Sequence, residues 1–277
     1  MTVPTLVNEL LDKLGGPEKY NLNSILQIDS KSDDQTDTFA SSDYYDTDSF
    51  VKFCKPSDQK FSTLSLNIEC LNAKFDQLTA FIKMLDEENC FIDAILIQET
   101  WLTDKQCEKD AIKQFDIPGY HTIPLGRKCG RKGGLLIYLK EIYTYSFCDL
   151  PSLITYSSDW EGLFINITHK HNEALPNKIT LSNIYRPPRQ NNSNASVDSF
   201  LNPFSNIFKL LCKENSTMIT GGDFNLNLLK LTEREKFQEF FDLFVANGSF
   251  PQIAIGLKHN DVTASVKEQS ILVDMID

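Results

Sequence analysis

Short apolar runs of strand length recur along the chain from Phe61 onward, and longer segments with helical spacing separate them. Six runs have this character: STLSLNIECL, DAILIQETWL, GGLLIYLK, GLFINITH, KITLSNIY and STMITGGDF. Their apolar positions are continuous or alternate with polar ones, as in strands that bury both faces or one face. Strands that alternate with helices in this way predict an α/β fold.

Three segments place apolar residues three or four positions apart, which predicts helices that bury one face. The first covers residues 73–85, the second covers residues 232–248, and the third is expected to begin at Asn202. Residues typical of helix ends flank them: Asn72 before the first, Thr232, Glu235 and Gly248 at the ends of the second, and Pro203 in the first turn of the third. The expected buried stripes are Phe75, Leu78, Ile82 and Leu85; Phe237, Phe240, Phe241, Phe244 and Val245; and Phe204, Ile207, Phe208 and Leu211.

The first 58 residues show neither pattern. They carry eleven acidic residues against five lysines, and the stretch SKSDDQTDTFASSDYYDTDSF has few aliphatic side chains. A segment of this composition buries too little apolar surface to offset the entropy that it loses on ordering. We therefore expect residues 1–58 to be an acidic, largely disordered tail, and residues 59–277 to form one domain.

Length and composition agree with a single large domain, because 277 residues with 41% hydrophobic and 11% aromatic side chains enclose a sizeable core. No apolar run approaches the roughly 20 residues that cross a membrane, and the N-terminus lacks the pattern of a signal peptide. We therefore expect an intracellular protein, nuclear or cytoplasmic, with no membrane partner. The seven cysteines form no CxxC pair, which favours free thiols over disulfides or zinc.

Polar side chains that interrupt the apolar runs are the best candidates for function, because a buried charge or amide is costly unless it is paired or used. Five places stand out: Asn67 in TLSLNIECL, Glu99 after AILIQ, Asn183 and Tyr185 in LSNIYRPP, Asp223 and Asn225 in ITGGDFN, and Asp274 in ILVDMID. We expect Gly221 and Gly222 to break their strand, so that the following Asp and Asn lie on a turn.

Each of these residues also has a purely structural interpretation when it is taken alone. The structural alternatives are a turn for Asn67, the first turn of a helix for Glu99, strand packing for Tyr185, an Asx turn for Asp223 and Asn225, and a strand-end charge for Asp274. The five places in this order are together far more specific than any one of them.

Further segments in the same order extend the pattern: QETWLTDK, FDIPGYHTIPLGRKCGRKGGLLIYLK, IYRPP and GGDFN. With the five polar places, they make the chain from about Phe61 to its last residue resemble the apurinic-type endonuclease domain of non-LTR, LINE-type retrotransposons. That domain belongs to the exonuclease-endonuclease-phosphatase superfamily. The resemblance implies a four-layer α/β sandwich, in which two mixed β-sheets pack face to face and helices lie outside.

The resemblance also implies a phosphodiesterase that depends on Mg²⁺ or Mn²⁺. Glu99, helped by Asn67, would bind the metal, because Mg²⁺ prefers carboxylate and amide oxygens. The metal would polarise a phosphoryl oxygen and stabilise the leaving alkoxide. Asp223 would orient or deprotonate the attacking water, and Asn225 and Tyr185 would donate hydrogen bonds to the phosphate.

Basic residues gather in the stretch RKCGRKGG, although the formal net charge of the chain is −11. Such an acidic chain is by itself a poor partner for nucleic acid, because phosphate contacts need lysine and arginine. If the partner is DNA, as the resemblance implies, the first phosphate contacts are expected from Arg127, Lys128, Arg131, Lys132, Arg186 and Arg189. The alternative for the RKCGRKGG stretch is a solvated hairpin loop.

The last run, ILVDMID, bears on activity. The resemblance implies that Asp274 is the carboxylate that orients an active-site histidine. That histidine and its neighbouring Asp would lie beyond residue 277, and His259 precedes Asp274 and is not expected to replace it. We therefore expect the domain to be C-terminally incomplete, without its last strand and catalytic loop.

Three functions stay open at this point. The first is a DNA endonuclease that nicks target DNA as part of a retrotransposon-derived open reading frame. The second is a catalytically inactive retroelement remnant that lacks the terminal histidine. The third is a phosphatase or phospholipase-type member of the same superfamily, which would share the metal-binding acids but is not expected to carry ETWL with YRPP. Cleavage activity separates the first two, and substrate choice separates the third.

Overall fold

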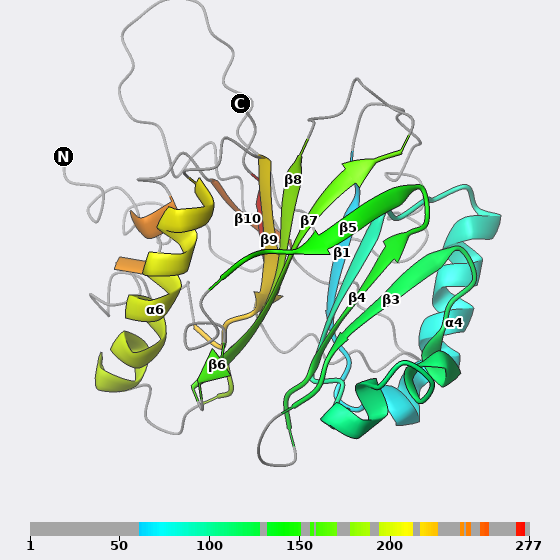
Figure 1. Ribbon diagram of the computed structural model, residues 1–277, viewed down its shortest axis with the longest axis horizontal. Coiled ribbons are helices and arrows are strands. Elements are labelled where there is room, and N and C mark those ends of the chain that lie inside the picture. Colours follow the sequence, from blue (N-terminus) through cyan, green and yellow to red (C-terminus); the bar gives the residue numbers. More distant parts are fainter. Residues whose placement is uncertain are drawn as a thin grey trace, which may run out of the picture.

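Strands in this protein form two sheets, and helices lie on their outer faces (Figure 1). The computed structural model describes residues 61–127, 132–150, 156–157, 159–170, 178–188, 194–212, 217–226, 239–240, 242–244, 250–254 and 270–274. The expected acidic tail and most of the helix expected at 232–248 lie outside these residues. No helix in the described part is long and apolar enough to cross a membrane.

The smaller sheet contains four strands in the order β1-β2-β4-β3. The strands are β1 (Thr63–Asn67), β2 (Ala94–Gln98), β3 (Tyr120–Leu125) and β4 (Leu135–Lys140). β1 and β2 are parallel, and β4 is antiparallel to both of its neighbours. Helix α4 (Leu71–Glu87) connects β1 to β2, and two 3-10 helices, η1 (Asp104–Cys107) and η2 (Ile112–Phe115), precede β3.

The larger sheet contains seven strands, in the order β10-β11-β9-β8-β7-β5 with β6 paired to β7. The strands are β5 (Tyr143–Phe147), β6 (Tyr156–Ser157), β7 (Trp160–His169), β8 (Ile179–Tyr185), β9 (Thr217–Asp223), β10 (Phe250–Ala254) and β11 (Ser270–Asp274). β8 and β9 are parallel and are connected by helix α6 (Asn194–Cys212), whereas the other pairs are antiparallel.

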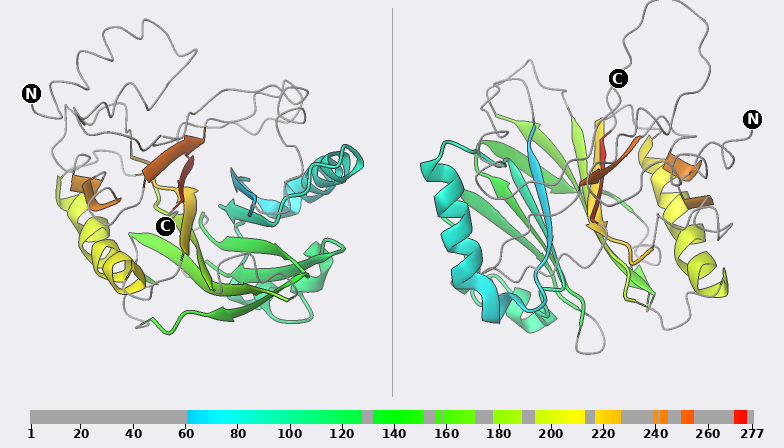
Figure 2. Two further views of the ribbon diagram at one scale, coloured as in Figure 1. Left: turned by 90° about the horizontal axis from the view of Figure 1, so that it is seen from above. Right: turned by 180° about the vertical axis from the view of Figure 1, so that it is seen from behind.

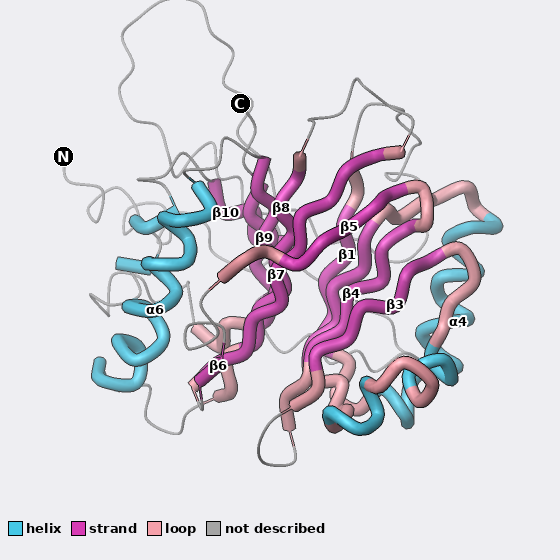
Figure 3. Tube along the Cα trace, in the orientation of Figure 1, coloured by secondary structure: helices cyan, strands magenta, loops and turns pink. Residues whose placement is uncertain are grey.

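The two sheets face each other, with α4 outside the smaller sheet and α6 outside the larger one (Figure 2, Figure 3). A buried cluster that includes Leu96 and Ile137 from one sheet and Ile165 and Leu181 from the other fills the space between the sheets. Separate clusters lie under α4 and under α6. The expected four-layer α/β sandwich is therefore confirmed.

The strands expected from the apolar runs are all present. β1, β2, β4, β7, β8 and β9 each lie within or overlap one of the six runs, and β11 overlaps ILVDMID. β3 and β5 were not predicted, because neither has a sustained apolar pattern. β3 buries only Tyr120 and Ile123, and in β5 the four residues after Tyr143 are exposed.

The helices differ from expectation at their N-terminal ends. α4 begins at Leu71 after Cys70, whose side chain makes no capping hydrogen bond, so the expected cap at Asn72 is wrong. α6 begins at Asn194 and contains Pro203 in its interior. The aromatic stripe explains the longer helix: buried Val197, Phe200 and Leu201 continue the expected stripe toward the N-terminus.

Phenylalanines dominate the core under α6. Phe204, Ile207, Phe208 and Leu211 are buried as expected, and so are Phe240 and Phe244 from the segment after β9. The rings of Phe208 and Phe244 meet edge to face with centroids 4.9 Å apart. The described cysteines, Cys70, Cys90, Cys107 and Cys148, form no disulfide with one another.

A buried polar network joins the two sheets at their centre. Gln98 Nε2 of β2 donates to Asn183 Oδ1 of β8 at 2.6 Å, and both residues are 0% exposed. Asn183 Nδ2 in turn donates to the main-chain carbonyls of Ile97 at 2.9 Å and Leu136 at 3.0 Å, both in the smaller sheet. Asn183, one of the polar residues noted in the apolar runs, therefore fixes one sheet against the other.

Candidate active site

The carboxyl ends of the two parallel strand pairs meet at one edge of the sandwich. Asn67 ends β1, Glu99 follows β2, Tyr185 ends β8 and Asp223 ends β9. Asn67 Nδ2 donates to Glu99 Oε1 at 3.1 Å and to Asp223 Oδ2 at 2.8 Å. One amide nitrogen thus holds two carboxylates from opposite sheets close together.

Glu99 lies on a tight turn and is only 4% exposed. Its φ angle is +53° and that of Trp101 is +59°, a backbone conformation that residues other than glycine rarely adopt. Trp101 Nε1 donates to Glu99 Oε2 at 3.1 Å. The main-chain N–H groups of Thr100 and Trp101 donate to the carbonyls of Gly134 at 3.1 Å and Gly133 at 2.8 Å. These bonds hold the turn, and with it the Glu99 carboxylate, in one position.

Strained backbone is concentrated around this edge. Among the described residues other than glycine, those with positive φ are Glu69, Cys70, Asn89, Glu99, Trp101 and Asn225. All except Asn89 lie in the segments that directly follow β1, β2 and β9. Such conformations persist only where the surroundings enforce them, and they cluster at functional sites.

Asp223 is the last residue of β9, so Gly221 and Gly222 do not break the strand as we expected. They allow a close approach instead: a Cβ on Gly222 would lie 2.1 Å from the Ile184 carbonyl oxygen, and one on Gly221 would lie 2.5 Å from Leu96 Cδ1 across the sheets. Asp223 Oδ1 accepts the main-chain N–H of Asn225 at 3.1 Å. This bond is the Asx turn that the sequence offered as the structural alternative.

Burial controls the protonation of Asp223. It raises the pKa of this carboxyl to about 6, the Asn67 side chain and the Asn225 main-chain N–H oppose the rise, and the nearby Glu99 adds to it. At pH 7 the carboxylate is therefore mostly ionised, yet its pKa is close enough to neutrality for it to accept a proton from water.

Tyr185 is 1% exposed, and its hydroxyl is one of the buried polar atoms without a hydrogen bond of ordinary geometry to the described residues. Burial, and next the negative charge of Glu99, raise its pKa well above the ordinary tyrosine value. The hydroxyl therefore stays protonated at neutral pH. It is a hydrogen-bond donor held beside Glu99.

Arg186 and Asn225 support the turn after β9. Arg186 is 1% exposed, and its Nη1 donates to the carbonyls of Phe224 at 3.3 Å and Asn225 at 3.2 Å. Asn225 Nδ2 donates to the Arg186 carbonyl at 2.7 Å. Burial of the guanidinium against the protein's own main chain argues against the expected phosphate contact from Arg186, which stays a prediction.

The basic residues near the site are only partly described. Lys128, Arg131 and Arg189 lie outside the described residues. Lys132 Nζ lies 3.8 Å from Glu99 Oε2, and the lysine side chain is 55% exposed. The Arg127 main-chain N–H donates to the Leu102 carbonyl at 2.8 Å, which places the start of the basic stretch beside the Glu99 turn.

Asp274 lies at a different level of the larger sheet. In the pairing of β11 with β9, Ser270 is opposite Asp223 and Asp274 is opposite Ile219. Four residues of strand separate these levels, which corresponds to about 13 Å. The structure does not bring the main chain of Asp274 to the Asn67, Glu99 and Asp223 group, and its expected role stays a prediction.

One acidic residue at the site was missed by the sequence reasoning. Glu161 is the second residue of β7, just before the apolar run GLFINITH, and lies opposite Tyr185 in the β7-β8 ladder. Its Oε2 accepts the Gly134 main-chain N–H at 2.6 Å. The only signal in the sequence is a single charge at the start of an apolar run, which does not distinguish this residue from an exposed strand end.

The donor set fits a hard divalent cation in part. Among the described residues no group of three or more His, Cys, Asp or Glu side chains could hold a metal ion. Mg²⁺ needs only one or two carboxylates, since it keeps several waters, and Glu99 and Asp223 supply two. Asn67 presents its amide nitrogen to both carboxylates, and its Oδ1 accepts the Glu69 main-chain N–H at 3.2 Å. Asn67 therefore holds the carboxylates, and Glu99 and Asp223 are the residues able to bind the metal.

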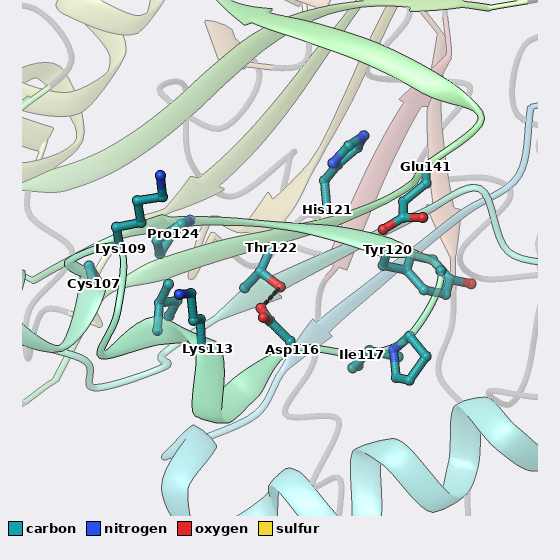
Figure 4. Close-up of a pocket in the computed structure, with 13 residues that line it drawn as sticks. Cys107, Lys109, Lys113, Asp116, Ile117, Tyr120, His121, Thr122, Pro124 and Glu141 are labelled. Atoms are coloured by element: carbon teal, nitrogen blue, oxygen red, sulfur yellow. Dashed lines mark hydrogen bonds between the residues drawn. The ribbon is translucent and has the colours of Figure 1, made fainter.

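An open pocket lies elsewhere, between the 3-10 helices and β3 (Figure 4). Its lining includes Lys113, Asp116, His121 and Glu141, and Asp116 Oδ1 accepts the Thr122 hydroxyl at 2.7 Å. It contains none of the residues that surround Asn67, so it is separate from the candidate active site.

No protein-family profile matches this sequence, and no curated protein is similar to it in sequence. The fold is similar to that of the AP endonuclease LMAP from Leishmania major, with a TM-score of 0.53, 13% identity and coverage of 83% of this chain and 86% of that chain. It is also similar to the 3′ phosphatase NExo from Neisseria bound to a product DNA hairpin, with a TM-score of 0.50, 13% identity and coverage of 78% and 86%.

A third similar structure is an endonuclease/exonuclease/phosphatase family protein from Bacteroides thetaiotaomicron, with a TM-score of 0.50, 16% identity and coverage of 78% of this chain and 83% of that chain. At such identities the similarity concerns the fold. The chain has the fold of the endonuclease/exonuclease/phosphatase proteins.

Proposed function

We propose that this chain is a divalent-metal-dependent phosphodiesterase that nicks DNA, of the type found as the endonuclease domain of non-LTR retrotransposons. One observation carries the proposal: the Asn67 amide joins the Glu99 and Asp223 carboxylates, one from each sheet, at the shared carboxyl edge. Buried acids this close together are costly, and they are typical of sites that bind a cation and transfer protons.

Each residue then has a chemical task. Glu99 would hold Mg²⁺ or Mn²⁺, which would polarise a phosphoryl oxygen and stabilise the leaving alkoxide. Asp223 orients the attacking water and accepts its proton, as its pKa of about 6 allows. Tyr185 offers its protonated hydroxyl to a phosphate oxygen. Asn67 keeps the two acids in place.

DNA is the substrate favoured by the surroundings of the site. The basic stretch that begins at Arg127 and ends at Lys132 adjoins the Glu99 turn, and Lys132 lies beside Glu99 itself. A half-exposed lysine beside the reacting centre is able to contact a phosphate of the DNA backbone. The motifs ETWL and YRPP support the retrotransposon type, and a similar structure, NExo, is bound to a DNA hairpin.

The test is nicking of supercoiled plasmid by the full chain with Mg²⁺, with Mn²⁺ and with EDTA. We expect metal-dependent nicking that Glu99→Gln and Asp223→Asn each reduce by at least about 100-fold. Glu87→Gln is the matched control, because Glu87 is an exposed helix residue paired with Lys83 at 3.7 Å, and it should leave the rate unchanged.

Two results would overturn the proposal. If a 3′-phosphorylated oligonucleotide or a small phosphate ester is hydrolysed in a Glu99-dependent manner while plasmid is untouched, the chain is a phosphatase of the same fold. If neither substrate is cleaved with either metal, the chain is the catalytically inactive remnant.

A further inference from the structure

Glu161 reaches from the larger sheet to the entry of β4 in the smaller one. Its Oε2 accepts the Gly134 N–H at 2.6 Å, whereas the residue itself pairs with Tyr185 in the β7-β8 ladder. Glu161 is therefore the tie between β7 and the Gly133-Gly134 pair.

The same glycine pair carries the Glu99 turn. The Gly133 and Gly134 carbonyls accept the N–H groups of Trp101 and Thr100, the two residues that follow Glu99. Gly133 and Gly134 have φ angles of +97° and +83°. The chain of contacts runs from the Glu161 carboxylate through two main-chain units to the residue that bears the metal-binding acid.

A side chain on either glycine would meet the side chains of Glu161 or Thr100. A Cβ on Gly133 would lie 2.7 Å from Glu161 Oε1, and one on Gly134 would lie 2.4 Å from Thr100 Oγ1. The glycines are thus packed between the Glu161 carboxylate on one side and the Glu99 turn on the other.

The described ends of the basic stretch lie beside residues 99–104, the segment that follows β2. At its start, the main chain of Arg127 forms an isolated parallel β-bridge with Thr103. A Cβ on the preceding Gly126 would lie 2.6 Å from the main-chain nitrogen of Asp104. At its end, Lys132 precedes the glycine pair that Glu161 holds. Displacement of the glycine pair would move both Glu99 and Lys132.

We propose that Glu161 is a positioning residue, which fixes the Glu99 turn and the end of the basic stretch through its hydrogen bond to Gly134. The inference rests on the proposed function, because Glu99 and Lys132 are there the metal-binding acid and a phosphate contact. Glu161 does not touch the substrate, and it acts through the glycine pair.

Two variants of the full chain test this role, with amide hydrogen exchange as one readout and plasmid nicking as the other. In Glu161→Ala the amides of Thr100 and Trp101 should exchange at least about 10-fold faster, while those of β4 from Ile137 onward stay protected. The kcat for nicking should fall by about 10-fold to 100-fold, and KM should change by less than about 3-fold.

The Glu161→Gln variant should restore both readouts to within about 3-fold of wild type, because its amide oxygen still accepts the Gly134 N–H. Glu141→Ala is the matched control, since Glu141 is an exposed acid at the other end of β4. If Glu161→Ala does not fold, Glu161→Asp, with a side chain one methylene shorter, carries the same expectation.

The exchange readout separates this inference from the proposed function. Unchanged exchange at Thr100 and Trp101 in folded Glu161→Ala overturns the positioning role, whatever the enzyme does. Faster exchange in a chain that cleaves no substrate supports the positioning role and removes the proposed function. An equal loss of kcat in the Ala and Gln variants would also overturn the role, because it would show that the charge itself takes part.

Discussion

Asn67 shows how a neutral side chain allows two carboxylates to occupy one site. The negative charge of Glu99 raises the pKa of Asp223, and the hydrogen bond from Asn67 lowers it. Without that N–H both acids would be buried close together with less compensation, and Asp223 would be protonated at a higher pH. The sequence suggested Asn67 as a metal ligand, and its part as a bridge between two acids is apparent only when both sheets are in place.

Arg186 and Lys132 are both basic residues near the site, but their environments predict opposite effects of substitution. Arg186→Ala removes a buried guanidinium that serves the carbonyls of Phe224 and Asn225, so we expect a loss of about 3 kcal/mol in the free energy of unfolding. Lys132→Ala removes a half-exposed lysine that lies 3.8 Å from the buried Glu99 carboxylate, and should change stability by less than about 1 kcal/mol. Urea denaturation measures both values.

Substitutions at the same two positions should have the opposite order of effects on DNA binding. Lys132→Ala should lower the affinity for duplex DNA and reduce the slope of log K against log salt by about 1. A neutral variant, Arg186→Gln, that folds should leave this slope unchanged. A salt slope that drops in Arg186→Gln would show that the arginine contacts phosphate after all.

Glu161 should make stability depend on pH near neutrality. Burial raises its pKa from 4.5 to about 7, against the opposing effects of the Gly134 N–H and of Arg127. Between these values the folded protein binds more protons than the unfolded chain, so this carboxyl contributes less to the free energy of unfolding as pH rises. Relative to wild type, Glu161→Gln should therefore gain about 2 kcal/mol between pH 5 and pH 8.

The comparison of the two proteins at each pH cancels the titration of Asp223 and of the other acids, because both chains contain them. Urea denaturation at pH 5 and pH 8 gives the four values that are needed. A constant difference between Glu161→Gln and wild type across this range would show that Glu161 has an ordinary pKa.

At the level of single residues, the sequence was a better guide to which side chains are candidates for the site than to their burial and hydrogen-bond partners. Asn67, Glu99 and Asp223 were all selected as candidates, because an acid or amide at the end of an apolar strand is unusual, and the structure brings the three together. Arg186 was assigned to DNA because its type suits phosphate, and only the packing of α6 and the turn after β9 shows that it is buried. Glu161 was missed for the related reason that its partner is a main-chain N–H contributed by a different sheet.

Two glycines, Gly222 in β9 and Gly119 just before β3, are required for distinct physical reasons. In Gly222→Ala the new Cβ would meet the Ile184 carbonyl oxygen at 2.1 Å, and neither main-chain segment can move without disrupting the β8-β9 ladder. Gly119 also has a positive φ, of +83°, but nothing lies within 4 Å of a Cβ built there. The first position is limited by space and the second only by its backbone conformation.

Alanine substitutions should separate these two costs. We expect Gly222→Ala to lower the free energy of unfolding by more than about 3 kcal/mol, and Gly119→Ala by about 1 kcal/mol. Thermal unfolding followed by circular dichroism measures the difference. Equal losses at the two positions would mean that the strand end relaxes and that the approach of β9 to β8 is not tight.

The elements that the sequence did not predict are those whose stability comes from neighbours. β5 exposes the four residues after Tyr143, and it is a strand because it pairs with β7. Pro203 suggested a helix start, yet the burial of Val197, Phe200 and Leu201 extends α6 beyond it. Strands with continuous apolar runs, such as β2 and β8, were predicted because burial on both faces is written in their own residues.

At the scale of the whole molecule, the candidate site is divided between two sheets. Asn67 and Glu99 belong to the smaller sheet, and Tyr185 and Asp223 belong to the larger one. The sequence, with its resemblance, predicted two sheets face to face, but strand order and the relative position of the sheets are not contained in a hydrophobic pattern. The Gln98 and Asn183 side chains provide that information in the structure, since their hydrogen bonds fix β8 against β2 and β4.

This network predicts that the polar pair Gln98 and Asn183, which lies between the sheets, controls the relative position of the site residues. Asn183→Leu leaves the Gln98 amide without its acceptor and the carbonyls of Ile97 and Leu136 without their donor. It should therefore lower the free energy of unfolding by about 3 kcal/mol and the nicking rate by at least about 10-fold. The double variant Gln98→Leu/Asn183→Leu removes the orphaned amide, and should recover part of the stability through apolar packing between the sheets. It should not recover the nicking rate, because an apolar contact holds the sheets together without fixing their relative position. Urea denaturation and plasmid nicking by the two variants measure both quantities. If the nicking rate recovers together with stability, the network contributes only to folding. The position of the two carboxylates would then be set by Asn67 alone.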